Sequence, residues 1–398
     1  MNKTESNRLQ KVEESSTLAM AALAREYRSK GVDVISLSLG EPDFNTPDFI
    51  KDAAKEGIDQ NYSKYMPVNG YQDLREAISK KFKRDNDIHY NADQIVVSTG
   101  AKQSIANVVL SCVNPGDEVI VPAPFWVSYE EIIKMAEGIP VFIETSIEND
   151  FKITPSQLQN AITDKTKMMI YSSPCNPSGS VYSKDELRSL ADVLVNFPVI
   201  TVVSDEIYEH INFTSNYFSM GAFNDMYNQV VTVNGVSKSF AMTGWRLGYI
   251  GAPEWLAKAC TKIQGQFTSG TSGISQRAAI AAISSSPSVV YEMKSAFLKR
   301  RDFVLTELNK IDGIRINKPQ GAFYVFPDIS AFFNKSYNQF NIKSADDLAM
   351  YLLETAKVAL VTGNAFGSPN CVRISYASSI DSLKEAMTRI SKALNKLV

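Results

Sequence analysis

Cysteine, histidine and excess charge of either sign are scarce in this sequence. Its 398 residues include four cysteines and two histidines. The cysteines are widely spaced and form no CxxC pair, so we expect no metal site, and reduced thiols in the cytoplasm. The 41 basic residues nearly balance the 43 acidic ones. This balance argues against a nucleic-acid or anionic-membrane surface as the main function.

Long apolar runs and nucleotide-binding motifs are lacking as well. No uncharged apolar stretch approaches the length of a membrane span, and the polar N-terminus lacks the apolar core of a signal peptide. Both features favour a cytoplasmic protein. Neither G-x-G-x-x-G after a strand nor G-x-x-x-x-G-K-[ST] occurs, which disfavours a nicotinamide dehydrogenase.

Strand-like and helix-like segments alternate from about residue 48 to residue 290. The strand-like runs, such as QIVVSTG and FPVITVVSDE, are apolar without alternation, which is typical of strands buried on both faces. Together with helical runs such as AKQSIANVVLSC, they predict a mostly parallel α/β sheet flanked by helices. Residues 291–398 resemble a smaller α+β unit, with strands expected at IRINKP and GAFYVFP and an irregular connection at 327–344. We expect a large domain at 48–290 and a small domain formed by 1–47 and 291–398.

Several residues that suit chemistry follow the expected strands, at the sheet edge where α/β proteins bind ligands. The turn before Ala101 and Lys102 offers free N–H groups to a phosphate, although a plain tight turn has the same pattern. Trp126 suits either a stacking platform or a core position. Asn176, between two prolines, suits either an amide directed into a cleft or ordinary turn chemistry.

The two sharpest candidates carry opposite charges. Asp205 ends a buried strand, where a carboxylate needs a cationic or donor partner, unless it caps a helix. Lys238 lies between two serines, and a lowered pKa would let it form a Schiff base with an aldehyde. Arg246 suits a phosphate. The alternative is that Lys238 is a solvated loop lysine and that Arg246 forms a surface salt bridge. Together with Tyr208, these residues suit pyridoxal phosphate, which needs a lysine, a carboxylate at its ring nitrogen, donors at its phenolate oxygen and an anion cradle.

The sequence resembles the class I aminotransferases of fold type I, and within them it is most similar to bacterial aspartate aminotransferases. The likeness covers nearly the whole chain in SLSLGEPDFNTP, KYMPVNGYQDLREAI, STGAKQS, PFWVSYEE, SSPCNPSG, VSDEIYEHI, SKSFAMTGWRLGY, GAFYVF and VRISYA. It implies a mostly parallel, seven-stranded sheet with a smaller α+β domain. It also implies an enzyme that interconverts L-aspartate and 2-oxoglutarate with oxaloacetate and L-glutamate by a ping-pong mechanism.

The resemblance implies a role for each cofactor-binding residue. Lys238 is expected to form the Schiff base and to shuttle the proton at the substrate Cα, and Asp205 to pair with the pyridine nitrogen. Tyr65 is expected to reach the phosphate of the other subunit in a homodimer. The remaining cofactor contacts are expected from Tyr208 and Asn176 at the phenolate oxygen, Trp126 on the ring, and Ala101, Lys102, Ser237 and Arg246 at the phosphate.

The same likeness implies how substrates bind. Arg373 is expected to hold the α-carboxylate, and this part of the site is expected to include Gly40, Trp126 and Asn176. Lys102, assisted by Thr17, is expected to read a distal carboxylate, although Lys102 at a solvent edge is the alternative. Related prephenate aminotransferases have a basic residue near the position of Glu13, so this acid weakens a prephenate reading. The aromatic residues at 323–326 would equally suit aromatic amino acids as substrates.

Two positions depart from the family pattern, and other functions remain to be weighed. Cys175 replaces an amide residue before Asn176, and Gly235 replaces a hydroxyl residue three positions before Lys238. A lyase that cleaves C–S bonds could use the same fold and the same lysine. An effector-binding domain of a transcription regulator is disfavoured, because only about 30 residues precede the first strand and the charge is not basic.

Overall fold

The computed structural model describes residues 5–214 and 216–398. Its centre is a seven-stranded sheet of order β2-β8-β7-β6-β5-β3-β4. The strands are β2 (Ile95–Ser98), β3 (Glu118–Ala123), β4 (Ile139–Glu144), β5 (Thr166–Ser172), β6 (Thr201–Asp205), β7 (Val230–Gly235) and β8 (Gly248–Gly251). Only β8 runs antiparallel to its neighbours. The expected mostly parallel α/β sheet is therefore confirmed.

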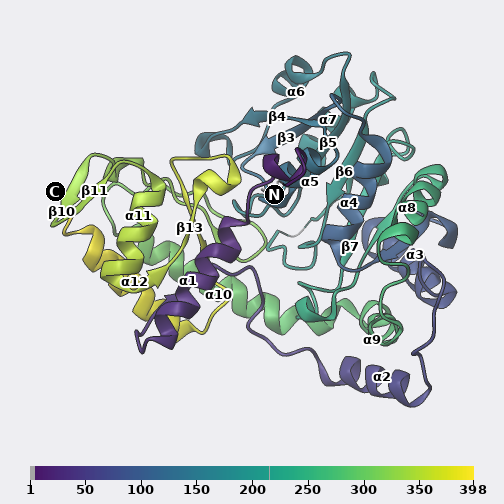
Figure 1. The fold of residues 1–398 in the computed structure, drawn as a ribbon, viewed down its shortest axis with the longest axis horizontal. Coiled ribbons are helices and arrows are strands. Elements are labelled where there is room, and N and C mark those ends of the chain that lie inside the picture. Colours follow the sequence, from purple (N-terminus) through teal and green to yellow (C-terminus); the bar gives the residue numbers. More distant parts are fainter. Residues whose placement is uncertain (1–4, 215) are drawn as a thin grey trace, which may run out of the picture.

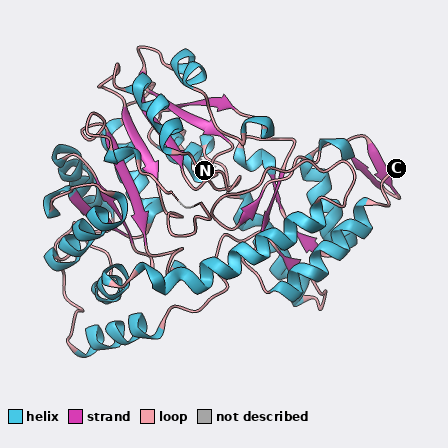
Figure 2. Ribbon diagram, turned by 180° about the vertical axis from the view of Figure 1, so that it is seen from behind, coloured by secondary structure: helices cyan, strands magenta, loops and turns pink. Residues whose placement is uncertain are grey.

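The central strands are buried on both faces, because helices pack on either side of the sheet (Figure 2). One apolar layer joins the sheet to α4, α5 and α8, and another joins it to α6 and α7. A third apolar cluster joins α2, α3 and α9. These helices are α2 (Asp48–Asp59), α3 (Gln72–Asn86), α4 (Ala101–Cys112), α5 (Ser128–Met135), α6 (Pro155–Ala161), α7 (Lys184–Leu194), α8 (Glu254–Phe267) and α9 (Gly273–Ser284).

The strand directions gather the candidate residues at one sheet edge. Strands β5, β6 and β7 are parallel, so their carboxyl ends lie at the same edge of the sheet. Asp205, the last residue of β6, and the turn after β7 that carries Lys238 are therefore at that edge. Because β8 is antiparallel to β7, its start, just after Arg246, lies at that same edge. Carboxyl ends of parallel strands are the usual ligand site of such sheets.

The part of the chain after residue 290, which runs from green to yellow in Figure 1, contributes most of a second apolar core. This core also takes in Leu37 and reaches Tyr208 in the larger body. Its elements include α1 (Ser16–Ser29), β1 (Ile35–Ser36), α10 (Tyr291–Leu308), β9 (Tyr324–Val325), β10 (Lys335–Tyr337), β11 (Phe340–Ile342), α11 (Ala345–Tyr351), β12 (Val358–Ala359), β13 (Val361–Thr362), β14 (Val372–Ser375) and α12 (Ile380–Leu394). The domain boundaries at 48 and 290 stay a prediction.

Two details in this part differ from the expected pattern. Residues 327–344 are not irregular, because β10 and β11 form an antiparallel hairpin in which Tyr337 pairs with Phe340. Asn338 at its tip has a φ of 53°, a conformation that asparagine tolerates in tight hairpins. The strand expected at 314–319 was wrong. There only Arg315 forms a bridge, with Asp328, because the Asn317 amide turns inward to bond Asp150 and the Ser178 carbonyl.

Within the described residues, no helix has both the length and the apolar character that crossing a membrane requires.

Candidate active site

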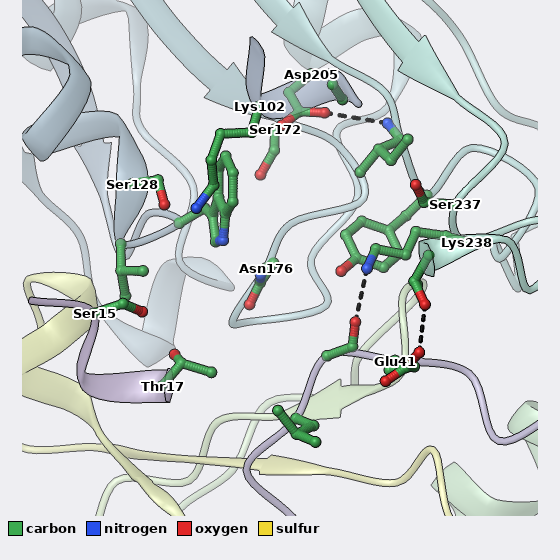
Figure 3. Close-up of a pocket in the computed structure, with 18 of the residues that line it drawn as sticks. Ser15, Thr17, Glu41, Lys102, Ser128, Ser172, Asn176, Asp205, Ser237 and Lys238 are labelled. Atoms are coloured by element: carbon green, nitrogen blue, oxygen red, sulfur yellow. Dashed lines mark hydrogen bonds between the residues drawn. The ribbon is translucent and has the colours of Figure 1, made fainter. Parts of the chain in front are cut away.

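A pocket of about 340 Å³ opens at the carboxyl edge of the sheet (Figure 3). It lies between the seven-stranded sheet and the smaller core, with the N-terminal segment on the side away from Asp205. Twelve of the thirteen residues expected at the site line it: Thr17, Gly40, Ala101, Lys102, Trp126, Asn176, Asp205, Tyr208, Ser237, Lys238, Arg246 and Arg373. The thirteenth, Tyr65, is fully exposed elsewhere on the chain.

Lys238 projects into this pocket from the turn after β7. Its Nζ donates to the Gly40 carbonyl at 2.7 Å, and no acid lies within ion-pair distance among the described residues. Burial among protein groups lowers the pKa of Lys238 to about 8, although the negative charge of Glu41 opposes this effect. The nearby cations Arg373 and Arg246 lower it further. A lysine in this state has a substantial neutral fraction near neutral pH, which nucleophilic and proton-transfer chemistry require.

Asp205 is buried at the end of β6 and has neutral donors only. Its Oδ2 accepts from the Tyr129 hydroxyl at 2.6 Å, and its Oδ1 accepts from the Ile207 N–H at 3.2 Å. Burial raises the pKa of Asp205, whereas these two donors lower it. The chain turns after Asp205 instead of starting a helix, so the helix-cap alternative is wrong. A buried carboxylate without a cation is stabilised by a positively charged ligand group.

An anion cradle lies beside these residues. Gly100 has a φ of 86° at the start of α4, and a Cβ there would lie 2.5 Å from an Arg246 Nη2 atom. The backbone can therefore approach the guanidinium closely only because position 100 is glycine. The first N–H groups of α4, from Ala101 and Lys102, have no acceptor within the helix. With the Ser237 side chain they form a set suited to a phosphate.

Arg373 is a buried cation that lacks an acidic partner. Its Nη1 donates to Asn176 Oδ1 at 2.9 Å and its Nη2 to the Ser38 carbonyl at 2.5 Å. Its Nε has no partner in the described structure. The guanidinium lies 4.5 Å from the Tyr324 ring centre and 4.8 Å from that of Phe366. Although burial lowers its pKa, an arginine stays charged, and the planar fork suits a ligand carboxylate.

The other end of the pocket combines one cation with an aromatic ring. Lys102 Nζ lies 5.0 Å from the Trp126 ring centre. Burial lowers the pKa of Lys102, and the charge of Arg246 adds to this effect. Thr17, in the first turn of α1, has a buried Oγ1 without a hydrogen-bond partner among the described residues. These groups could hold a second anionic group of a ligand.

The charge balance of the pocket is its most informative property. Four basic side chains line it, and they meet only two acidic ones, Glu41 and Asp205. None of these six side chains forms an ion pair within the described structure. Such a pocket is suited to a ligand with several negative charges.

Some lining residues were not expected from the sequence. Tyr129, Ser172 and Glu41 face the pocket without having been expected there, whereas Tyr324 belongs to the aromatic run 323–326 that the sequence offered for aromatic substrates. Tyr129 follows Trp126 by three residues, a helical spacing that could have indicated a shared face. Glu41, in the loop after Gly40, and Ser172, at the end of β5, give no local signal.

The two departures from the family pattern are accommodated by packing. Cys175 is buried with its Sγ 3.6 Å from the Pro124 carbonyl. Gly235 pairs with Gly248, and a Cβ there would lie 3.0 Å from the Gly248 Cα and from the Leu247 carbonyl oxygen. A hydroxyl side chain at position 235 would therefore need the strand backbones to separate.

Known proteins resemble this chain over its full length. The family model described as "Aminotransferase class I and II" matches residues 32–390. A Petunia hybrida protein named bifunctional aspartate aminotransferase and glutamate/aspartate-prephenate aminotransferase is 45% identical, and the match covers 98% of this chain and 82% of that protein. A Nitrosomonas europaea aspartate/prephenate aminotransferase is also 45% identical, with coverage of 98% and 99%. The crystal structure of an aspartate aminotransferase from Rhizobium meliloti superposes with a TM-score of 0.96 at 40% identity, with both chains fully covered.

Proposed function

The chain belongs to the class I and II aminotransferases, and from that membership we propose that it uses pyridoxal 5′-phosphate to exchange amino groups between L-aspartate and 2-oxoglutarate. The products are oxaloacetate and L-glutamate. The observation that carries this proposal is the pocket with four unpaired cations, among them Lys238, whose pKa is lowered to about 8.

The pocket chemistry fits pyridoxal phosphate at each of its polar groups. Asp205, a buried carboxylate without a cation, suits a protonated ring nitrogen. The cradle around Gly100 suits a phosphate. When bound, the cofactor supplies an electron sink that stabilises negative charge at the substrate Cα. The residues that would hold it are Ala101, Lys102, Trp126, Asn176, Asp205, Tyr208, Ser237, Lys238 and Arg246.

Lys238 would act as the group that moves the proton at the substrate Cα. A pKa of about 8 leaves part of the amine neutral near pH 7, so it can accept a proton and then return it. The Gly40 carbonyl holds the Nζ at 2.7 Å and limits its range of positions. Arg373 would bind the α-carboxylate and so fix the Cα relative to that amine.

Lys102 and Thr17 favour a dicarboxylic substrate. Arg373 satisfies one carboxylate of aspartate or glutamate, and a second carboxylate needs another cation. Lys102 is that cation, and the unpartnered Thr17 hydroxyl, which lines the same pocket, can donate to the same carboxylate. The aspartate aminotransferase names among similar proteins support the same choice.

Prephenate is the second candidate acceptor, because the names of two similar proteins include it. At position 13 this chain has an exposed glutamate, whose N–H donates to a Glu131 carboxylate oxygen at 2.7 Å. Glu13 supplies no cation for the second carboxylate of prephenate, where related prephenate aminotransferases are expected to use a basic residue. The observation therefore favours aspartate and glutamate over prephenate.

We also propose a homodimer in the cytoplasm. Tyr65 is fully exposed and lies outside the pocket of its own chain, as expected for a side chain that completes the site of a second copy. The four cysteines are free, which fits a reducing compartment.

A donor and acceptor screen tests the substrate assignment. The purified enzyme is assayed with aspartate, glutamate, phenylalanine and cysteine as donors and with 2-oxoglutarate and prephenate as acceptors. The proposal predicts that aspartate with 2-oxoglutarate has the highest kcat/KM. A preference for phenylalanine or prephenate would overturn the aspartate assignment, and pyruvate with sulfide from cysteine would indicate a lyase instead.

A further inference from the structure

Tyr324 lines the pocket without a role in the proposed function, yet it contacts three residues that have one. It is buried on β9, next to β14, the strand that carries Arg373. Its hydroxyl lies 2.8 Å from the Tyr208 hydroxyl, and its ring centre lies 4.5 Å from the Arg373 guanidinium. A Cβ at Gly40 would collide with the Tyr324 hydroxyl. Tyr324 therefore links the cofactor side of the pocket to the substrate side.

The direction of the hydrogen bond between the two tyrosines follows from their surroundings. In the described structure, Tyr208 is the only hydrogen-bond partner of the Tyr324 hydroxyl. A buried hydroxyl that donates to nothing loses its hydration without compensation. Both hydroxyls line the pocket, but in the proposed function the Tyr208 proton goes to the phenolate oxygen of the cofactor, so within the pair Tyr324 is the donor and Tyr208 the acceptor. Because Tyr208 faces the pocket, its own proton can reach a ligand oxygen.

We propose that Tyr324 is a positioning residue that donates to the Tyr208 oxygen and thereby directs the Tyr208 proton into the pocket. The inference rests on the proposed function, in which Tyr208 donates to the phenolate oxygen of the cofactor. Hydrogen bonds in a chain polarise one another, so Tyr208 becomes a stronger donor. Burial raises the pKa of both tyrosines, and both therefore keep their protons at working pH.

The ring of Tyr324 has a separate task. The Arg373 guanidinium lies over this ring and has no acidic partner in the described structure. The ring face is therefore a principal stabilising contact for this buried cation. A phenylalanine at position 324 keeps this contact and loses only the hydroxyl. A leucine loses both, so the two substitutions separate the two tasks.

The direct test is a pH titration of the absorbance of the bound cofactor in four proteins: wild type, Tyr324→Phe, Tyr208→Phe and the double variant. Loss of Tyr208 as a donor is expected to raise the apparent pKa of the bound chromophore by roughly 1 to 2. Tyr324→Phe is expected to raise it by roughly 0.2 to 0.6, because only the strengthening of that donor is lost. In the Tyr208→Phe background, Tyr324→Phe should add no further shift.

A matched control removes a hydroxyl from the same core. Tyr376 is buried and donates to the Ala322 carbonyl at 3.1 Å. Tyr376→Phe should leave the chromophore pKa unchanged. An equal shift in this control, no shift in Tyr324→Phe, or a full shift of Tyr324→Phe in the Tyr208→Phe background would overturn the positioning role.

The hydrogen bond itself is tested without the cofactor by denaturant unfolding of the same four proteins. If the two hydroxyls bond directly, each single variant already loses the same bond. The double variant should therefore lose less unfolding free energy than the sum of the two single losses. Additive losses would overturn the contact. A wild-type protein that binds no chromophore would contradict the proposed function, and this unfolding cycle would still decide the contact.

The KM for aspartate tests the ring. Tyr324→Phe is expected to change this KM by less than about twofold, whereas Tyr324→Leu should raise it by roughly 2- to 30-fold through the lost contact with Arg373. Equal KM values for the two variants would overturn the ring's support of Arg373.

Discussion

Two polar clusters lie side by side at the end of β6, and each contains a buried lysine. The lysine is paired with an acid in one cluster and has no acidic partner in the other. In the first cluster, Lys81 of α3 is buried, pairs with Glu209 and donates to Asn86 Oδ1 at 2.7 Å. In the pocket, Lys238 donates only to a backbone carbonyl. Asp205 belongs to the pocket, whereas the next residue, Glu206, belongs to the first cluster.

In the first cluster the lysine is paired with an acid of the protein itself. Burial would raise the pKa of Glu209, but pairing with Lys81 and His210 outweighs it and lowers the value to about 2. Asn86 donates to Glu209 at 2.8 Å and to Glu206 at 3.2 Å, so the amide connects both acids. This arrangement joins α3 to the chain after β6.

The contrast distinguishes a structural cluster from a binding one. Buried charges that are paired within the protein hold elements together, and removing one member exposes its partner to a desolvation cost. Charges left unpaired around a pocket lower stability unless a ligand completes them. The pocket lysine is therefore expected to matter for activity, and Lys81 for stability.

The largest expected effect is on activity at Lys238. Lys238→Ala removes both the nucleophilic amine and the proton carrier, so kcat should fall by at least about 10⁴-fold. Because Lys238 has no acidic partner, the free energy of unfolding should change by less than about 1 kcal/mol. Steady-state kinetics and urea unfolding measure the two quantities. Robust turnover by this variant would remove Lys238 from the chemistry.

Lys81→Met should give the opposite pattern. Losing one member of a buried ion pair leaves Glu209 unpaired, so the free energy of unfolding should fall by about 3–5 kcal/mol. The kcat of the folded protein should change little. Lys80→Met, at the exposed neighbouring position, is the control and should stay within about 0.5 kcal/mol of wild type. Equal losses at the two positions would contradict the structural role.

The pH dependence of stability should reveal Glu206. Burial raises its pKa from 4.5 to about 7. Between these values the folded protein keeps a proton that the unfolded chain has released, so the unfolding free energy falls as pH rises through this window. Glu206→Gln should remove about 3 kcal/mol of this fall, as measured by urea unfolding from pH 4.5 to pH 8. If the unfolding free energies of wild type and Glu206→Gln changed with pH in the same way, Glu206 would be excluded as the source of the fall.

The smallest expected effect is on substrate choice at Lys102. Lys102→Ala should lower kcat/KM for aspartate by roughly 10- to 100-fold, because a charge-assisted contact to the distal carboxylate is lost. The value for phenylalanine, which has no such carboxylate, should fall by less than about threefold. Equal losses for the two donors would assign Lys102 to the pocket structure only.

Asp205 and Lys238 could be predicted from the sequence because strand ends are readable and parallel strands bring their ends together, whereas Thr17, Gly40 and Arg373 were expected only from the family resemblance. The helical run AKQSIANVVLSC coincides with α4 at both ends, since a glycine precedes it and a turn with proline and glycine at 115 and 116 follows. The hairpin of β10 and β11 was missed because its strands are three residues each and mix polar with apolar side chains.

Contacts between distant segments left no pattern in the sequence. Tyr208 and Tyr324 are 116 positions apart, and nothing in GAFYVF indicates their hydrogen bond. Lys81 lies in the charged run SKKFKRDN, which resembles a solvated helix face. Only its position three residues after buried Ile78 turns it inward, where Glu209 meets it from another element.

The central claim is that the unpaired lysine, and not the paired one, carries the chemistry. Borohydride reduction of the purified protein after incubation with pyridoxal phosphate, followed by peptide mass spectrometry, identifies any lysine that has become attached to it. The account predicts a single modified peptide that contains Lys238, and an unmodified Lys81. Modification at another lysine, or none at all, would contradict it.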